Sequence, residues 1–278
     1  MNRRTFIESS IAATIIAGRP AWASDDAHKI DRVGLQLYTV RDAMKNDFEG
    51  TLAKVAGIGY REVEFAGYFG RAPKEIRSLL DGNNLSSPSE HVPYDTVEKK
   101  WPETLDAAHI VGHTYIVCPS IDETQRKQRD GWKHAAELFN RAGEASQKAG
   151  IQFAYHNHTF EFESDPQLGG KFPYDFLLAN TDPKFVNLEM DLGWATVAKQ
   201  DPVAYFDRYP GRFPLVHVKD FTKDGHMTEV GSGAIDWRRI FAQSGKAGIK
   251  HYFVEHDEPK SPFDSIRTSY QYLHDLRF

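Results

Sequence analysis

The chain is almost without cysteine, and it has no apolar run long enough to span a membrane. Cys118 is the single cysteine among 278 residues, which excludes an internal disulfide. The apolar run at residues 9–18 is about half of the roughly 20 residues that a membrane-spanning helix needs. Acidic residues outnumber basic ones, and the net charge of −5 repels nucleic acid and anionic membrane surfaces. We therefore expect no disulfide, no stable membrane anchor and no nucleic-acid partner.

Residues 1–23 have the order of an export signal. Arg3 and Arg4 precede the short apolar run, and a small–x–small cleavage motif ends it at residues 21–23. The paired arginines resemble the twin-arginine signal of bacteria. We therefore expect the twin-arginine (Tat) export machinery as a partner and a periplasmic or otherwise exported protein. Residues 24–278 form the expected mature domain.

Strand-like runs alternate with helical stretches over the whole mature chain. Eight strands are expected, at residues 33–39, 62–66, 85–91, 113–118, 152–157, 185–191, 214–219 and 252–255. The stretches that favour helices include residues 51–56, 75–80, 98–108, 132–148, 174–178, 237–243 and 262–276. Eight such units, about 30 residues apart and with no linker between them, predict an α/β fold with one closed parallel barrel, a single (β/α)8 TIM barrel.

Glycine positions favour the barrel over an open doubly wound sheet. The open sheet usually carries a glycine-rich phosphate turn after its first strand, but residues 38–42 contain no glycine. Elsewhere glycine stands between a helical stretch and a strand, at Gly57, Gly150 and Gly248 and in a weaker form at Gly112. Glycine accepts the left-handed conformation that ends a helix, so we expect helix ends at these positions.

Four polar side chains stand at the expected ends of successive strands, where barrel enzymes carry their chemistry. They are His156, Asp191, His217 and Glu255. One such residue alone is more often structural, but four at matching positions would be costly to bury without a cation. Two imidazoles and two carboxylates suit one divalent ion of Mn, Co, Fe or Zn. The sequence therefore predicts one metal site, although His158 shares a strand face with His156 and is an alternative ligand.

Three other residues have simpler interpretations. Trp194 comes shortly after Asp191 and is expected to line a pocket. Glu189 is interpreted as a barrel-interior ion pair lower than the metal site. Cys118 has no neighbour in sequence that would activate a thiolate, so it is expected to pack in the core.

The sequence resembles the xylose isomerase-like TIM barrels, the family labelled sugar phosphate isomerase/epimerase, over nearly all of residues 30–277. The motifs that carry the resemblance are Leu35-Gln36-Leu37-Tyr38-Thr39-Val40-Arg41-Asp42, Glu62-Val63-Glu64, Tyr155-His156-Asn157-His158, Met190-Asp191-Leu192-Gly193-Trp194, His217-Val218-Lys219-Asp220 and Val254-Glu255. The resemblance implies a divalent metal held by Glu, Asp, His and Glu at the ends of the last four strands. Asp191, His217 and Glu255 match the last three positions, and His156 stands where many members carry Glu.

The resemblance also implies proton abstraction next to a carbonyl. A divalent ion bound by a hydroxy-ketone stabilises the enediolate that forms when the proton leaves. Glu255 is expected to remove that proton, and His158 or Lys219 to return it elsewhere or to protonate a departing oxygen. Glu64, His91 and Lys219 are the candidates for contacts with substrate hydroxyls.

The expected function is that of a metal-dependent isomerase or epimerase for a non-phosphorylated sugar or keto-sugar. The export signal argues against a cytoplasmic sugar-phosphate substrate. Because His156 replaces one of the two glutamate bases of the family's epimerases, a lyase that performs β-elimination on a 3-keto-glycoside is the alternative. A further alternative is a non-catalytic periplasmic sugar-binding protein. A DNA-repair endonuclease, which shares this barrel, does not fit the excess of acidic over basic residues, because negative charge repels nucleic acid.

Overall fold

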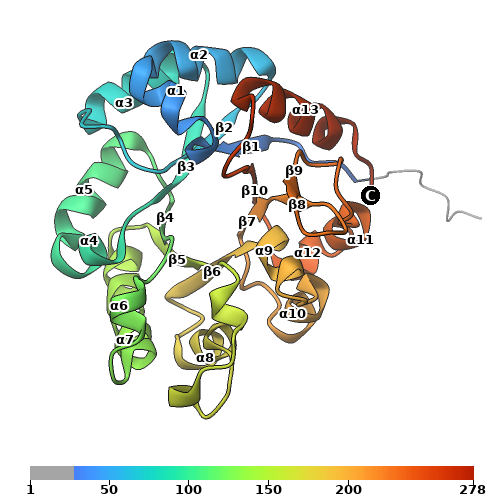
Figure 1. Ribbon diagram of the computed structural model, residues 1–278. Coiled ribbons are helices and arrows are strands. Elements are labelled where there is room, and N and C mark those ends of the chain that lie inside the picture. The colour runs from blue at the N-terminus through green and yellow to red at the C-terminus, as the bar shows by residue number, and fades with distance from the viewer. Residues whose placement is uncertain (1–27) are drawn as a thin grey trace, which may run out of the picture.

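The computed structural model describes residues 28–278, and the predicted export signal lies outside these residues. Eight strands pair in the order β1-β10-β7-β6-β5-β4-β3-β2 and close into a parallel barrel. Figure 1 shows the strands as a ring with the helices outside it. The strands are β1 Val33–Gln36, β2 Glu62–Phe65, β3 Ser86–His91, β4 Tyr115–Cys118, β5 Gln152–His156, β6 Val186–Asp191, β7 Leu215–Val218 and β10 His251–Val254. The predicted (β/α)8 TIM barrel is confirmed.

Helices follow each barrel strand and cover the outer face of the ring. The α-helices are α1 Arg41–Asn46, α2 Phe48–Ile58, α3 Pro73–Gly82, α4 Tyr94–Lys99, α5 Trp101–Val111, α6 Glu123–Arg126, α7 Gly131–Lys148, α8 Pro173–Asn180, α9 Leu192–Val197, α10 Pro202–Arg208, α11 Trp237–Phe241, α12 Ser244–Ala247 and α13 Pro262–Asp275. Short 3-10 helices are η1 Leu37–Val40, η2 Phe160–Phe162 and η3 Pro166–Leu168. Within residues 28–278, no helix has the length and apolar character to cross a bilayer.

All eight expected strands are present, with ends within three residues of the expected bounds. The first strand ends early because the Gln36 side-chain oxygen accepts the backbone N–H of Tyr38 at 3.0 Å, which starts η1. The sequence did not predict the two-stranded ribbon that follows β7, formed by β8 (Asp220–Phe221) and β9 (Met227–Thr228). In this ribbon Met227 accepts the backbone N–H of Asp257, from the segment after β10, at 3.2 Å, and Figure 1 shows the ribbon beside β10.

The glycine expectations hold at three of four positions. Gly112, Gly150 and Gly248 follow helices with φ of 93°, 73° and 82°, in the left-handed region. The expectation for Gly57 is wrong, because α2 continues through it to Ile58. Gly59, with φ of 130°, ends that helix instead.

The inside of the barrel is filled by apolar side chains below the site. Tyr115, Val117, Ala154, Leu215 and Phe253 form a separate buried cluster, each with at most 3% of its surface exposed. Ala154 and Leu215 lie two residues before His156 and His217, so alternation along each strand brings all four side chains to the interior. The barrel is therefore a packed core, with the Glu62–His251 pair at its amino end and a larger group of polar side chains near the carboxyl ends of the strands.

A close backbone contact joins α9 to β7 beside the site. A Cβ at Gly193 would lie 2.2 Å from the carbonyl oxygen of Lys219, so only glycine lets the two segments approach this far. The Asp191 carboxylate accepts the N–H of Trp194 at 2.7 Å and begins α9. The contact therefore fixes Lys219 next to Asp191.

Replacing Gly193 by alanine should lower the free energy of unfolding by about 1–3 kcal/mol and displace Lys219, because backbone has to move. Urea-induced unfolding followed by circular dichroism measures the change. Gly57→Ala is the matched control: it is helical and a Cβ there would meet nothing within 4 Å. That variant should be unchanged or up to about 1 kcal/mol more stable. Equal stability of the two variants would contradict a close contact between Gly193 and the Lys219 backbone.

Candidate active site

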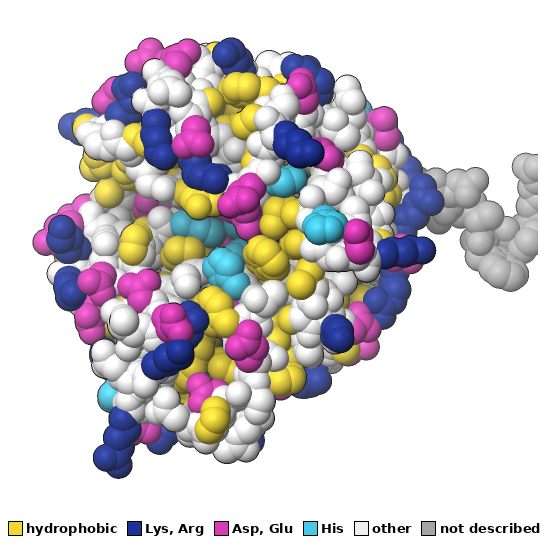
Figure 2. Space-filling model, in the orientation of Figure 1, with side chains coloured by type: hydrophobic (Ala, Val, Ile, Leu, Met, Phe, Trp, Pro, Cys, Tyr) yellow, Lys and Arg dark blue, Asp and Glu magenta, His cyan; other side chains and the backbone are white. Residues whose placement is uncertain are grey.

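The carboxyl ends of the strands surround a cavity of about 560 Å³. Figure 2 shows histidine side chains near the middle of this face of the molecule, with acidic side chains close by. The cavity is lined by Tyr38, Ala66, Gly67, His91, Pro93, Pro119, His156, His158, Lys219, Glu255, Asp257 and Glu258. A volume of this size suits a sugar or a small glycoside.

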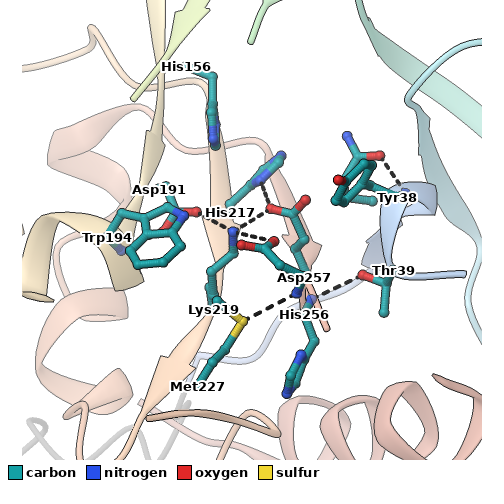
Figure 3. Close-up of polar contacts among 12 residues, drawn as sticks. Tyr38, Thr39, His156, Asp191, Trp194, His217, Lys219, Met227, His256 and Asp257 are labelled. Atoms are coloured by element: carbon teal, nitrogen blue, oxygen red, sulfur yellow. Dashed lines mark hydrogen bonds and ion pairs between the residues drawn. The ribbon is translucent and has the colours of Figure 1, made fainter. Parts of the chain in front are cut away.

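The four predicted metal ligands come together at this end of the barrel. His156, Asp191, His217 and Glu255 each offer an atom within 4.8 Å of the others. They extend from β5, β6, β7 and the residue after β10, and all four are buried. Strand register explains the grouping, because Asp191 pairs with His217 across β6 and β7. Their convergence agrees with the predicted site, and their role as ligands stays a prediction (Figure 3).

A second set of possible ligands overlaps the first. His91 and Glu189 join His156 and His217 in a group that also meets within 4.8 Å. Glu189 has no exposed surface, and its Oε2 lies 2.7 Å from His91 Nε2 and 3.2 Å from both His156 Nδ1 and His217 Nε2. The sequence placed Glu189 lower than the site, as an ion pair. Its spacing of two residues from Asp191 was the signal that both carboxylates share an inward face.

Several buried polar atoms in these two sets lack a hydrogen-bond partner. They are His156 Nδ1, Glu189 Oε1 and Asp191 Oδ2, the last lying 3.2 Å from the Lys219 ammonium. Burial lowers the pKa of His156 well below its usual value, so this imidazole is neutral and has a free lone pair. Unpartnered buried nitrogen and oxygen atoms are costly, and they suit a divalent ion. The residues present therefore fit the implied metal.

Lys219 is the central charged group of the cavity wall. Its Nζ lies 3.2 Å from Asp191 Oδ2, 2.9 Å from Glu255 Oε2 and 2.8 Å from Asp257 Oδ1, and only 1% of the residue is exposed (Figure 3). Burial alone would lower the pKa of Lys219, but the three carboxylates raise it above its usual value. Lys219 is therefore an ammonium ion near neutral pH, and it is held in one position.

Two predicted catalytic residues, Glu255 and His158, also line the cavity. Burial would raise the pKa of Glu255, but Lys219 and His217 hold it well below its usual value. Burial and the charge of Lys219 lower the pKa of His158 to about 4. Near neutral pH the wall thus carries a carboxylate, a neutral imidazole and an ammonium ion within reach of one ligand.

The predicted substrate-binding residues occupy different places. His91 lines the cavity, as expected of a residue that contacts substrate. Trp194 does not line it: its ring lies beside Lys219, with Nζ 5.0 Å from the ring centre (Figure 3). Glu64 has no exposed surface, and its two oxygens accept hydrogen bonds from Gln36 Nε2 at 2.7 Å and Ser89 Oγ at 2.6 Å. The arrangement therefore does not support direct substrate contact by Glu64 or Trp194.

Sequence reasoning missed Glu161, which holds the segment that carries His158. Glu161 lies in η2 and is completely buried, and it accepts the Tyr155 hydroxyl at 2.6 Å and the His158 backbone N–H at 2.8 Å. Burial raises the pKa of Glu161 to about 7, against the opposite effect of these hydrogen bonds. No charge pattern in the sequence marks this residue, because its neighbours Phe160 and Phe162 read as ordinary packing.

Glu161 should make the stability of the protein depend on pH between about 5 and 7. An unfolded glutamate releases its proton near pH 4.3, whereas folded Glu161 keeps it to about pH 7. The unfolded state then binds fewer protons, so the free energy of unfolding falls as pH rises through this window. Glu161→Gln should remove this fall. Between pH 5 and 7.5 its free energy of unfolding, measured with urea, should exceed that of wild type by about 1–3 kcal/mol.

The exposed neighbour Glu163 provides the control for that experiment. Glu163→Gln should track wild type at every pH. A gap between wild type and Glu161→Gln that stays constant with pH would contradict the shifted pKa.

Comparison with known proteins places this geometry in a family. The model of the xylose isomerase-like TIM barrel matches residues 52–276. The chain belongs to this family. Among similar proteins, an inosose dehydratase of Lacticaseibacillus casei is 24% identical over 268 residues, covering 81% of this chain and 88% of the relative.

Two solved structures of similar fold carry isomerase or epimerase names. A sugar phosphate isomerase/epimerase from Parabacteroides distasonis is 30% identical with a TM-score of 0.76, and the match covers 92% of this chain and 98% of that one. An L-ribulose 3-epimerase is 14% identical with a TM-score of 0.66, and the match covers 88% of this chain and 93% of that one. This similarity shows the fold alone. The family relationship and the dehydratase relatives support an enzyme of this xylose isomerase-like barrel type acting on a small molecule.

Proposed function

We propose that the protein is a metal-dependent lyase that eliminates an oxygen substituent β to the carbonyl of a keto-sugar. The observation that carries this proposal is the contact between Lys219 Nζ and Glu255 Oε2, 2.9 Å apart in the cavity wall. This contact holds a carboxylate and an ammonium ion side by side on one wall of the cavity. The inosose dehydratase relatives, which carry the name of a lyase, support the same reaction class.

The proposed reaction uses this pair as base and acid. Glu255 takes the proton from the carbon next to the carbonyl, and the electron pair of that C–H bond forms the new C=C bond. The bond to the β-oxygen breaks, and the departing oxygen takes a proton from Lys219. The proton on Glu255 then passes to Lys219 across their hydrogen bond and restores both groups. Because the two groups are adjacent, proton and oxygen leave from the same face of the sugar.

A divalent ion bound beside these residues would supply positive charge to the carbonyl oxygen as the proton leaves. His156 and His217 would hold it, because both belong to each of the two overlapping ligand sets. The chain's own task is to hold Glu255 in place, which His217 does through a contact of 2.7 Å between its Nδ1 and Glu255 Oε2.

Epimerisation between two bases on opposite faces fits the geometry less well. Such a mechanism needs a second carboxylate across the sugar from Glu255. The end of β5 instead carries His156 and the following His158, which has a pKa of about 4. Of the three carboxylates that line the cavity, Glu255 and Asp257 both contact the same ammonium group of Lys219.

The charge of the cavity favours a substrate without phosphate. Glu255, Asp257 and Glu258 line it, and Lys219, the one lysine or arginine in the lining that the structure describes, is already paired with carboxylates. A dianionic phosphate would meet net negative charge here. We therefore propose a neutral keto-sugar or 3-keto-glycoside as substrate.

Incubation with an aryl 3-keto-glucoside tests the reaction class. The purified protein with Mn²⁺ or Co²⁺ should release the aryl alcohol and form an unsaturated keto-sugar that absorbs in the ultraviolet. Treatment with a chelator should abolish release, and metal should restore it. If an isomeric keto-sugar with solvent deuterium forms and no aryl alcohol is released, the protein is an isomerase, as the name of the Parabacteroides neighbour suggests.

Two variants separate the acid from the metal site. Lys219→Met should retain about one ion per chain and lose roughly 10²–10⁴-fold in kcat, because the leaving oxygen has no proton donor. His217→Ala should lose metal and activity together, because His217 belongs to both ligand sets. Elemental analysis, the rate of aryl alcohol release and circular dichroism are measured on each. Wild-type activity in Lys219→Met would remove Lys219 from the mechanism.

A further inference from the structure

Two overlapping sets of ligands compete for one ion in the proposed enzyme. Both contain His156 and His217, and they differ in the remaining pair. The outer set adds Asp191 and Glu255, as the sequence predicted. The inner set adds His91 and Glu189. The charges and spacings around each pair decide between them.

The outer carboxylates already have a cation. The Lys219 ammonium lies 3.2 Å from Asp191 Oδ2 and 2.9 Å from Glu255 Oε2, in the place where an ion between those oxygens would lie. A divalent ion there would be repelled by an ammonium group a few ångströms away, at low dielectric constant. The outer pair therefore has little need of a metal.

The inner carboxylates have no lysine or arginine partner among the described residues. Glu189 and Glu64 are both completely buried, and among the described residues their charged contacts are with histidine alone. Histidine protons compensate these two carboxylates: His91 Nε2 bonds to Glu189 Oε2 and His217 Nε2 to Glu64 Oε2, each at 2.7 Å. A divalent ion can take the place of protons on imidazole and balance the same two charges, whereas it cannot displace the Lys219 ammonium.

Two of the three spacings among the inner atoms also match a coordination shell. An ion with bonds of about 2.1 Å to nitrogen and oxygen holds adjacent ligand atoms about 3.0 Å apart in octahedral geometry and about 3.4 Å apart in tetrahedral geometry. The nitrogens of His91, His156 and His217 lie 2.7, 3.2 and 3.2 Å from Glu189 Oε2. His156 Nδ1 has no hydrogen-bond partner, so its lone pair is free for a shared ion, while His217 Nε2 bonds to Glu64 Oε2 at 2.7 Å.

We infer that the metal ion binds in the inner set, held by His91, His156, Glu189 and His217, rather than between Asp191 and Glu255. This inference rests on the proposed metal-dependent function and places its ion. His217 would use Nε2 toward the ion, while its Nδ1 donates to Glu255, the usual arrangement of a carboxylate that orients a ligating imidazole. Glu255 is then free of the metal and available as the base. His91 and His156 line the cavity, so the set is open to substrate.

A pair of isosteric substitutions on one strand tests the inference. Glu189→Gln and Asp191→Asn remove one charge each, two residues apart on β6. The metal-free wild type and both variants are titrated with Co²⁺ alone, followed by the visible absorption of the ion and by elemental analysis after dialysis. Glu189→Gln should weaken binding at least about 100-fold, and Asp191→Asn should stay within about fivefold of wild type. Thermal unfolding checks that each variant is folded.

His91→Asn, at the partly exposed edge of the set, is the second variant should Glu189→Gln fail to fold, and it should also lose Co²⁺. Loss of Co²⁺ in Asp191→Asn with retention in Glu189→Gln or His91→Asn would overturn the inference and leave the proposed lyase intact. A wild type that binds no divalent ion would overturn both. Co²⁺ binding that depends on Glu189, in a protein that gives no elimination product, would overturn the proposed reaction and leave the inferred metal site intact.

Discussion

The pairing of the Lys219 ammonium with three carboxylates is the interaction on which the rest of the site depends. A buried ammonium ion with 1% exposure needs carboxylates at short distance to offset its lost hydration. Asp191, Glu255 and Asp257 supply them on three sides of Lys219. These carboxylates belong to β6 and to the segment after β10, so the pairing joins the strands on both sides of β7. The absence of a side chain at Gly193 lets α9 approach closely enough to complete it.

This interaction divides the polar end of the barrel into two parts. On one side an internal cation, Lys219, neutralises the carboxylates. On the other side Glu64 and Glu189 are surrounded by imidazoles, which can be protonated or can bind a metal ion. The division places the proposed acid and base together on one wall of the cavity and the proposed ion beneath them. In the proposed mechanism this asymmetry favours elimination over exchange of a proton between two faces.

The family relationship alone would not have chosen this function. The xylose isomerase-like barrel is shared by relatives with dehydratase names and by structures with isomerase and epimerase names. A fold hosts many reactions, so the argument for elimination depends on which side chains meet in this chain. Here the decisive features are His156 at the end of β5 and the contact of Glu255 with Lys219.

The sequence by itself determined the barrel, because alternating strands and helices of regular spacing have few other ways to bury their apolar faces. It also indicated that His156, Asp191, His217 and Glu255 share one end, since parallel strands bring their carboxyl ends to the same rim. It could not show that Lys219 already neutralises two of them, that Glu189 lies among three imidazoles, or that Glu64 is sealed beneath the cavity. Those relations depend on distances between side chains from strands far apart in the chain, and only the closed barrel sets these distances.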